Sequence, residues 1–130
     1  MTKQEIFDKV CAHLLAQKGK AVGEFDACLY RAPDGRKCAA GCLIEDAYYS
    51  PAMEGVSVPY SKNDMNNDKP SEAVRHRRAT LVSALEASGV PEATWPLVRE
   101  LQQVHDGFHP REWYKQLKQV GANHGLEMRP

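Results

Sequence analysis

The sequence lacks a long apolar run, an excess of charge of one sign, and any repeat or low-complexity tract. No stretch approaches the roughly 20 apolar residues that cross a bilayer. The first ten residues, MTKQEIFDKV, also lack the apolar segment of a signal peptide. We therefore expect a cytoplasmic protein without a membrane partner. Seventeen basic residues balance 17 acidic ones, so no overall field attracts nucleic acid, and we expect no nucleic-acid partner.

What the chain does have is the length and composition of one globular domain. It has 130 residues, of which 42% are hydrophobic and 26% are charged, so we expect a single domain over residues 1–130. Four cysteines in a chain without an export signal are expected to stay reduced. Reduced cysteines are better explained as core residues, metal ligands or a nucleophile than as disulfides.

Apolar periodicity predicts several helices. Thr2 and Glu5 form the pattern of a capping box, and apolar residues then repeat every three to four positions through about Gln17. Further helices are predicted to begin near Ser71, Pro91 and Pro110. The sequence therefore predicts a mainly α fold, with about five helices around one core.

The stretch from Cys28 to Asp46, CLYRAPDGRKCAAGCLIED, which we call the central stretch, combines a turn signal, two further cysteines and charged groups on either side. Pro33 and Gly35 predict a chain reversal between Arg31 and Lys37. The residues after this turn fit either the return strand of a hairpin or the start of a buried helix. We expect a short β-hairpin, inserted after the first helix, that runs into a helix. An α+β fold with a small antiparallel sheet is the alternative.

Two later segments have open roles. The segment from Ser50 to Pro70 is rich in Pro, Asn and Asp and predicts a long loop, which is either a lid over the central stretch or a surface excursion. The run from Arg75 to Arg78 lies at the positive end of a predicted helix dipole. It indicates either an anionic partner or a solvated helix face.

Paired cysteines and histidines raise the first chemical hypothesis. Cys38 and Cys42 are four residues apart, as are His105 and His109, so the four could bind zinc in a zinc-stabilised interaction domain. Pro110 disfavours helical geometry at His109, and the cysteines also fit a buried core. The leading interpretation therefore has no cofactor, with zinc as an alternative.

The same residues also suggest a nucleophile. A thiolate of Cys38 or Cys42, with His105 as base and Asp106 orienting it, would make a small cysteine-dependent hydrolase or transferase. Whether the protein is an enzyme is therefore left open, although we favour a protein without enzyme activity.

A third hypothesis is a pocket for a small polar ligand. Aromatic faces stack on a base while Arg and Lys meet phosphate, so a nucleotide-like ligand suits such a lining. The candidate ligand-binding residues are Tyr30, Arg31, Lys37, Gly41, Tyr48, His105 and Asp106.

The string YRAPDGRKCAAGCLIEDAYYSPAMEG, with the later His105-Asp106 pair, resembles a family of small uncharacterised proteins of bacteriophages, prophages and other mobile elements. The resemblance implies an accessory factor in the cytoplasm of a bacterial host. Such a factor binds a host protein or captures a nucleotide-like signalling molecule, and an anti-defence inhibitor is one form of it. A non-catalytic binding protein is therefore the leading interpretation. A homo-oligomer is also considered, with Trp95 and Trp113 as interface anchors if either is exposed.

Overall fold

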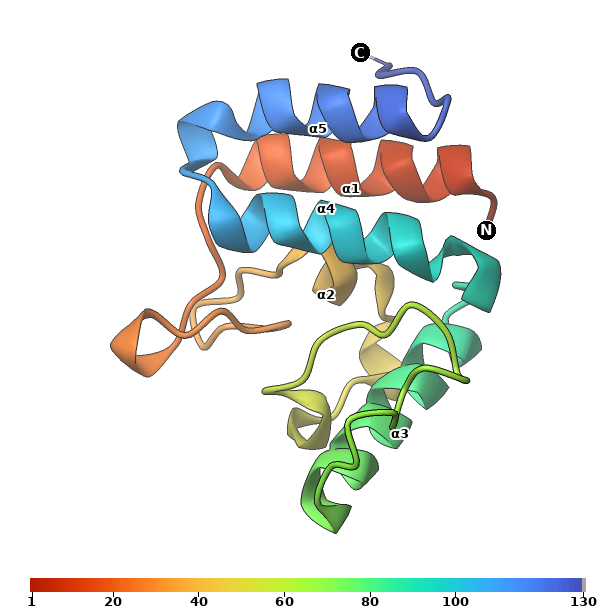
Figure 1. Cartoon of the computed structure of the whole chain (residues 1–130). Coiled ribbons are helices and arrows are strands. Elements are labelled where there is room, and N and C mark those ends of the chain that lie inside the picture. Colours follow the sequence, from red (N-terminus) through yellow and green to blue (C-terminus); the bar gives the residue numbers. More distant parts are fainter. Residues whose placement is uncertain (130) are drawn as a thin grey trace.

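The chain folds into α-helices joined by 3-10 turns and loops, in a computed structural model that describes residues 1–129 (Figure 1). The α-helices are α1 (Lys3–Gln17), α2 (Ala39–Leu43), α3 (Glu72–Ala87), α4 (Trp95–Gly107) and α5 (Trp113–Asn123). The 3-10 turns are η1 (Glu24–Asp26), η2 (Asp46–Tyr48), η3 (Pro51–Met53), η4 (Glu92–Thr94) and η5 (Pro110–Glu112). None of the helices described is both long and apolar enough to span a bilayer.

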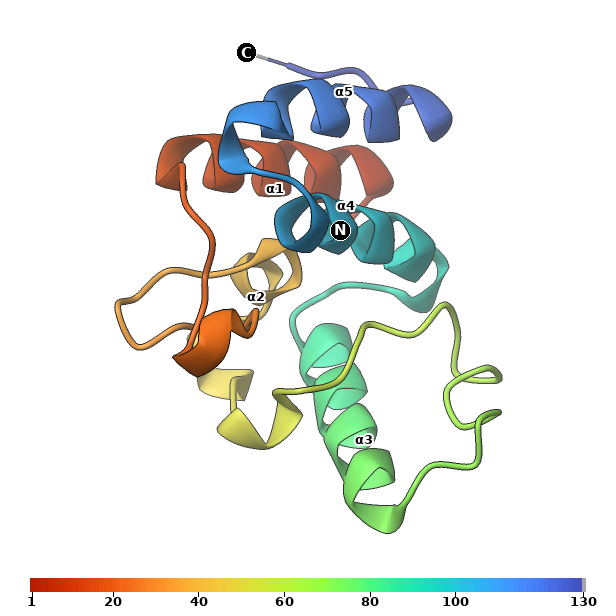
Figure 2. The same cartoon turned by 60° about the vertical axis from the view of Figure 1, so that its left-hand side comes forward.

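The predicted start of α1 is confirmed. The Thr2 hydroxyl accepts a hydrogen bond from the Glu5 amide at 3.1 Å, and the Glu5 carboxylate accepts one from the Thr2 amide at 3.0 Å. Both bonds satisfy amides that have no partner within the helix. In Figures 1 and 2, α1 lies between α5 and α4, with α2 below them and α3 lower still. The apolar face of α1 is therefore buried on several sides.

One hydrophobic core connects these helices, and it contains both tryptophans. Trp95 and Trp113 are fully buried. Their indole N–H groups donate to the carbonyls of Val90 and Phe108, at 3.2 and 3.1 Å. Because neither ring reaches the surface, neither tryptophan is available as the interface anchor considered from the sequence.

The predicted β-hairpin was wrong, and so was the alternative with a small sheet. Residues 1–129 contain no β-strand, only two isolated antiparallel bridges, Val22 with Cys28 and Arg31 with Lys37. The turn itself forms, with Gly35 at φ 89°. The ladder stops because the Tyr30 amide, which would make its next bond to the Cys38 carbonyl, donates to the Glu54 carboxylate instead, and because α2 begins directly after Cys38. The helical interpretation of the residues after the turn was the right one.

The run from Arg75 to Arg78 is used within the chain. Arg78 forms two parallel hydrogen bonds with the Asp68 carboxylate, at 2.8 and 2.9 Å, and Arg77 donates to the Glu54 carbonyl at 2.9 Å. Both acceptors belong to the long loop that precedes α3. These cations therefore hold the loop against α3, and their place at the positive end of a helix needs no external anion.

Candidate functional site

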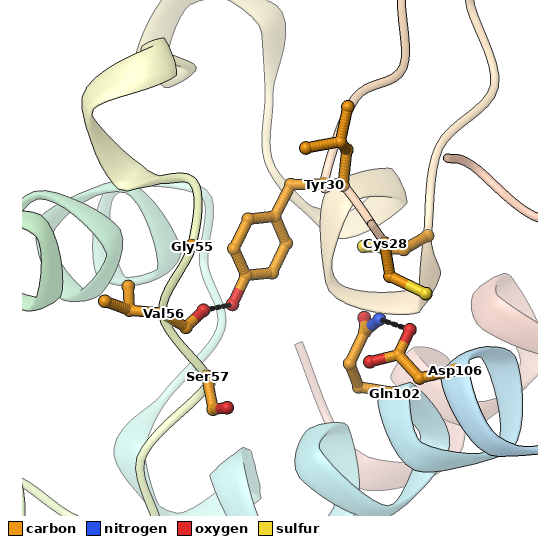
Figure 3. A pocket seen from close by; sticks show the side chains of 9 residues that line it. Cys28, Tyr30, Gly55, Val56, Ser57, Gln102 and Asp106 are labelled. Atoms are coloured by element: carbon orange, nitrogen blue, oxygen red, sulfur yellow. Dashed lines mark hydrogen bonds between the residues drawn. The ribbon is translucent and has the colours of Figure 1, made fainter. Parts of the chain in front are cut away.

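A pocket of about 220 Å³ lies between the segment of residues 28–30, the loop of residues 55–57 and the last turns of α4 (Figure 3). We call it the Asp106 pocket. Its lining consists of Cys28, Leu29, Tyr30, Cys38, Gly55, Val56, Ser57, Gln102 and Asp106. Three of the candidate residues from the sequence, Tyr30, Cys38 and Asp106, therefore meet here, from segments far apart in the chain.

Tyr30 is held by contacts at both ends. Its buried phenol donates a hydrogen bond to the Val56 carbonyl (Figure 3), and burial raises the pKa of that phenol well above its usual value. Its own carbonyl oxygen lies where a Cβ on Gly41 would be, at only 2.0 Å. Gly41 thus admits another stretch of backbone, which leaves no room for a ligand at that position.

The arrangement of His105 fixes which of its nitrogens carries the proton. The Ala21 amide lies 3.0 Å from Nε2, and Asp106 Oδ1 lies 2.7 Å from Nδ1. Because an amide N–H can only donate, Nε2 must accept, and the proton of the neutral ring is on Nδ1, facing Asp106. The buried ring also stacks on Trp113 at 5.5 Å. His105 therefore has no unused lone pair with which to accept a substrate proton or to bind a metal.

Asp106 is the charged group of the pocket. Burial acts to raise the pKa of its carboxyl, but hydrogen bonds from His105 and Gln102 outweigh this and lower the pKa below the usual value. The Gln102 amide donates to it at 2.8 Å (Figure 3). With 41% of its side chain exposed, Asp106 is an ionised hydrogen-bond acceptor that a ligand can reach.

The two cysteines proposed as nucleophiles are protonated thiols. The Cys38 sulfur is fully buried and accepts a hydrogen bond from the Gly41 amide at 3.3 Å, and burial raises its pKa well above the usual value. The Cys42 thiol donates to the Ala39 carbonyl at 3.1 Å, and burial raises its pKa to about 12. Within the described part of the chain no thiol is hydrogen-bonded to a histidine. The geometry therefore offers no activated thiolate.

The proposed zinc ligands are not brought together. Across residues 1–129, one group of three potential ligands has its ligand atoms within 4.8 Å of one another, and it consists of Cys28, His105 and Asp106. His109 instead accepts a hydrogen bond from the Arg111 amide at the start of η5. Ligation by Nδ1 of His105 would place a proton on Nε2, directly opposite the Ala21 amide. These residues, as they are arranged, therefore do not fit a metal ion.

Three polar residues of the pocket, Cys28, Ser57 and Gln102, were not among the candidates from the sequence, and Cys28 is the one beside Asp106 that carries a thiol. Its half-buried thiol has its pKa raised to about 11 by burial and by the neighbouring Asp106. No spacing rule connects a cysteine at the start of the central stretch with a helix end late in the chain. Only the close packing of α1 and α4, which brings the connector after α1 to His105, reveals the contact.

The remaining candidate ligand-binding residues lie elsewhere. The Arg31 guanidinium is 2.8 Å from the Asp46 carboxylate and stacks on the Tyr49 ring at 4.6 Å, and the Lys37 ammonium is 3.7 Å from the same carboxylate. Tyr48 lies against α3 and is partly exposed. None of the three lines the Asp106 pocket.

A second pocket, of about 540 Å³, shares Gly55, Val56 and Ser57 with the first. We call it the Arg99 pocket. The Arg99 guanidinium lies 4.4 Å from the Tyr60 ring and donates to the Val58 carbonyl at 2.8 Å. For the residues described, no carboxylate is within ion-pair distance of Arg99, and its Nε has no hydrogen-bond partner.

Together the two pockets offer hydrogen-bonding groups and an aromatic face, with a carboxylate at one end and a guanidinium at the other. They can hold and orient a polar molecule, and the protonated thiols and fully bonded histidine beside them supply no nucleophile or base. No protein-family model, curated protein or solved structure matches this chain.

Proposed function

We propose that the protein is a non-catalytic binding protein of a bacteriophage or other mobile element, and that it captures a nucleotide-like molecule of its bacterial host. Capture of a host signal would make it an anti-defence inhibitor. The observation that carries the proposal is the pair of adjoining pockets, which have different chemistry and share residues 55–57.

The Asp106 pocket suits the edge of a nucleobase. The Asp106 carboxylate accepts hydrogen bonds, while the Gln102 amide and the Ser57 hydroxyl both donate and accept. Its volume of about 220 Å³ is below the ~300–1,000 Å³ of most small-molecule sites. It therefore holds a single ring system rather than a whole nucleotide.

The Arg99 pocket suits the charged part of the same molecule. A guanidinium without a carboxylate partner is a donor for phosphate, and the half-exposed Tyr60 ring beside it offers a flat apolar surface. Asp64 and Asp68 also line this pocket, and Asp68 is already paired with Arg78. Binding by Arg99 is thus the step that distinguishes a nucleotide from its nucleoside.

The protonation states argue against the cysteine-dependent hydrolase or transferase considered from the sequence. General base catalysis needs a lone pair near the substrate, and both nitrogens of His105 are engaged. Nucleophilic catalysis needs a thiolate, and burial keeps Cys38 and Cys42 protonated.

The test is isothermal titration calorimetry with the common nucleosides and their monophosphates. We expect at least one monophosphate to bind, and to bind more tightly than its nucleoside. Ser57→Trp, which fills the space between the two pockets, should abolish binding. Gln103→Trp, on the exposed side of α4 and outside both pockets, is the matched control and should bind like the wild type.

Native mass spectrometry of protein taken directly from infected cells extends the test to ligands outside this panel. A bound small molecule, lost in Ser57→Trp and retained in Gln103→Trp, would support the proposal. Protein that carries no small molecule and binds none of the probes would contradict it.

A further inference from the structure

We propose that the protein self-associates through Phe25, whose ring enters an apolar pocket between α1 and α5 of a second copy. This inference is independent of the ligand proposed above, because neither pocket of the candidate site contains Phe25 or the residues that would receive it.

Phe25 is the most exposed large apolar side chain in the described residues. Its exposed fraction is 98%, against 57% for Tyr114, 51% for Tyr60 and 46% for Tyr48. A phenyl ring has no polar group that benefits from water, so removal of this surface from solvent is favourable. Within the part of the chain that the structure describes, no other segment covers it.

The backbone presents this ring at the tip of a closed loop. Phe25 has φ 57° and ψ 30°, a left-handed conformation that bulky residues rarely adopt. The loop is closed below it by the Val22–Cys28 bridge and by a hydrogen bond of 2.9 Å from the Gly23 amide to the Ala27 carbonyl. The exposed ring therefore lies at the tip of a loop whose base is closed by backbone hydrogen bonds.

A receiving pocket of about 430 Å³ lies between the end of α1 and the start of α5. The buried Trp113 and the half-buried Leu15 and Pro110 give it apolar walls, and the exposed cations Lys18 and Arg111 line it as well. Within residues 1–129 neither cation is in an ion pair.

The charges of the two surfaces are complementary. The exposed Glu24 directly precedes Phe25, and the receiving pocket carries Lys18 and Arg111. An apolar anchor with an acidic neighbour fits an apolar pocket with cationic neighbours, and this match favours a second copy of the chain as the partner.

The position of the two surfaces allows a closed dimer. Figures 1 and 2 both show the chain leaving the end of α1 and running along one side of the molecule to η1. The turn η1, which contains Phe25, and the neighbouring ends of α1 and α5 thus lie on the same side of the molecule. A two-fold axis can then place each Phe25 in the pocket of the other copy, so that both contacts form at once.

Sedimentation equilibrium over a wide dilution series tests the proposal. The mass of the wild-type protein should rise from one chain towards two as its concentration increases. Phe25→Ser should weaken dimerisation about tenfold or more, while Tyr48→Ser, at another exposed aromatic, should leave it unchanged. Unchanged circular dichroism of Phe25→Ser would show that the fold is kept.

A charge exchange tests the pairing itself. Arg111→Glu should weaken dimerisation, and the double variant Glu24→Arg with Arg111→Glu should restore part of it. A wild-type chain that stays monomeric up to millimolar concentration would overturn the proposal and leave a different protein as the partner of Phe25. Dimerisation of Phe25→Ser with wild-type affinity would overturn it too.

Discussion

At the scale of single residues, His105 is a structural residue that has the appearance of a catalytic one. Its ring accepts a hydrogen bond from Ala21, in the segment after α1, and is hydrogen-bonded to Asp106 at the end of α4. It also stacks on Trp113 at the start of α5. Its position before an aspartate suggested a base oriented by a carboxylate. In the structure both ring nitrogens make structural hydrogen bonds. The lone pair that a catalytic base needs instead accepts a hydrogen bond from the buried Ala21 amide.

His105→Ala should therefore cost stability. The substitution leaves the buried Ala21 amide without an acceptor and opens a cavity beside Trp113, and we expect a loss of about 3 kcal/mol in the free energy of unfolding. Urea denaturation measures this loss. His76→Ala, at an exposed histidine on α3, is the control and should stay within about 0.5 kcal/mol of the wild type. Equal effects of the two substitutions would contradict the structural role.

The thiols give a pH dependence of stability. Burial raises the pKa of Cys11 and Cys42 to about 12, and burial with the nearby Asp106 raises that of Cys28 to about 11. In the unfolded chain these thiols ionise near pH ~8.5. Above that pH the folded chain keeps protons that the unfolded chain has released. Their contribution to stability is thus fully present below about pH 8.5 and declines as the pH rises towards 11 to 12.

The urea concentration at the midpoint of unfolding should fall as the pH rises across this alkaline range. Alkylation of the cysteines should report the ionisation of the same thiols. Iodoacetamide should modify folded protein slowly near neutral pH and should modify Cys28 first as the pH is raised, because its pKa is the lowest of the three. All four cysteines should react rapidly in urea. Rapid modification of Cys38 in the folded protein would instead indicate an activated nucleophile and would contradict the binding function proposed here.

At the scale of elements, the helices were predictable and the hairpin was not. The capping box of Thr2 and Glu5 and the apolar periodicity of α1 are local signals, and local signals are what a sequence contains. The structure of the central stretch depends on a distant residue, because Glu54 accepts a hydrogen bond from the Tyr30 amide that a strand ladder would need. Nothing within the stretch itself shows that its donors are already used.

The docking of α2 gives a test at this scale. Gly41→Ala would place a Cβ 2.0 Å from the Tyr30 carbonyl oxygen, and backbone on both sides prevents relaxation. We expect a loss of about 3 kcal/mol or more in the free energy of unfolding. Gly107→Ala, in α4 with nothing within 4 Å of the added carbon, is the matched control and should be neutral or stabilising by up to about 1 kcal/mol. A tolerated alanine at Gly41 would mean that α2 packs differently.

At the scale of the whole molecule, some of the side chains that the sequence was expected to bring into one cleft lie together and others do not. Tyr30 and Asp106 were expected in one cleft, and both line the Asp106 pocket. Arg31 and Lys37 were expected there as well, but they pair with Asp46 instead. The difference is physical, because a charged side chain pairs with whichever carboxylate the fold brings near, and spacing along the chain does not contain that information.

The expectation of a single domain also belongs to this scale, and the two tryptophans can test it. Trp95 begins α4, close to the end of α3, and Trp113 begins α5. Since both belong to one hydrophobic core, the whole chain should unfold in one cooperative step. In Trp113→Phe the fluorescence reports only Trp95, and in Trp95→Phe only Trp113. Within each variant, the urea transitions by fluorescence and by far-ultraviolet circular dichroism should coincide, even though the substitution itself lowers the midpoint. A Trp95 transition that precedes the loss of helix would mean that α3 and the long loop packed on it unfold as a separate unit.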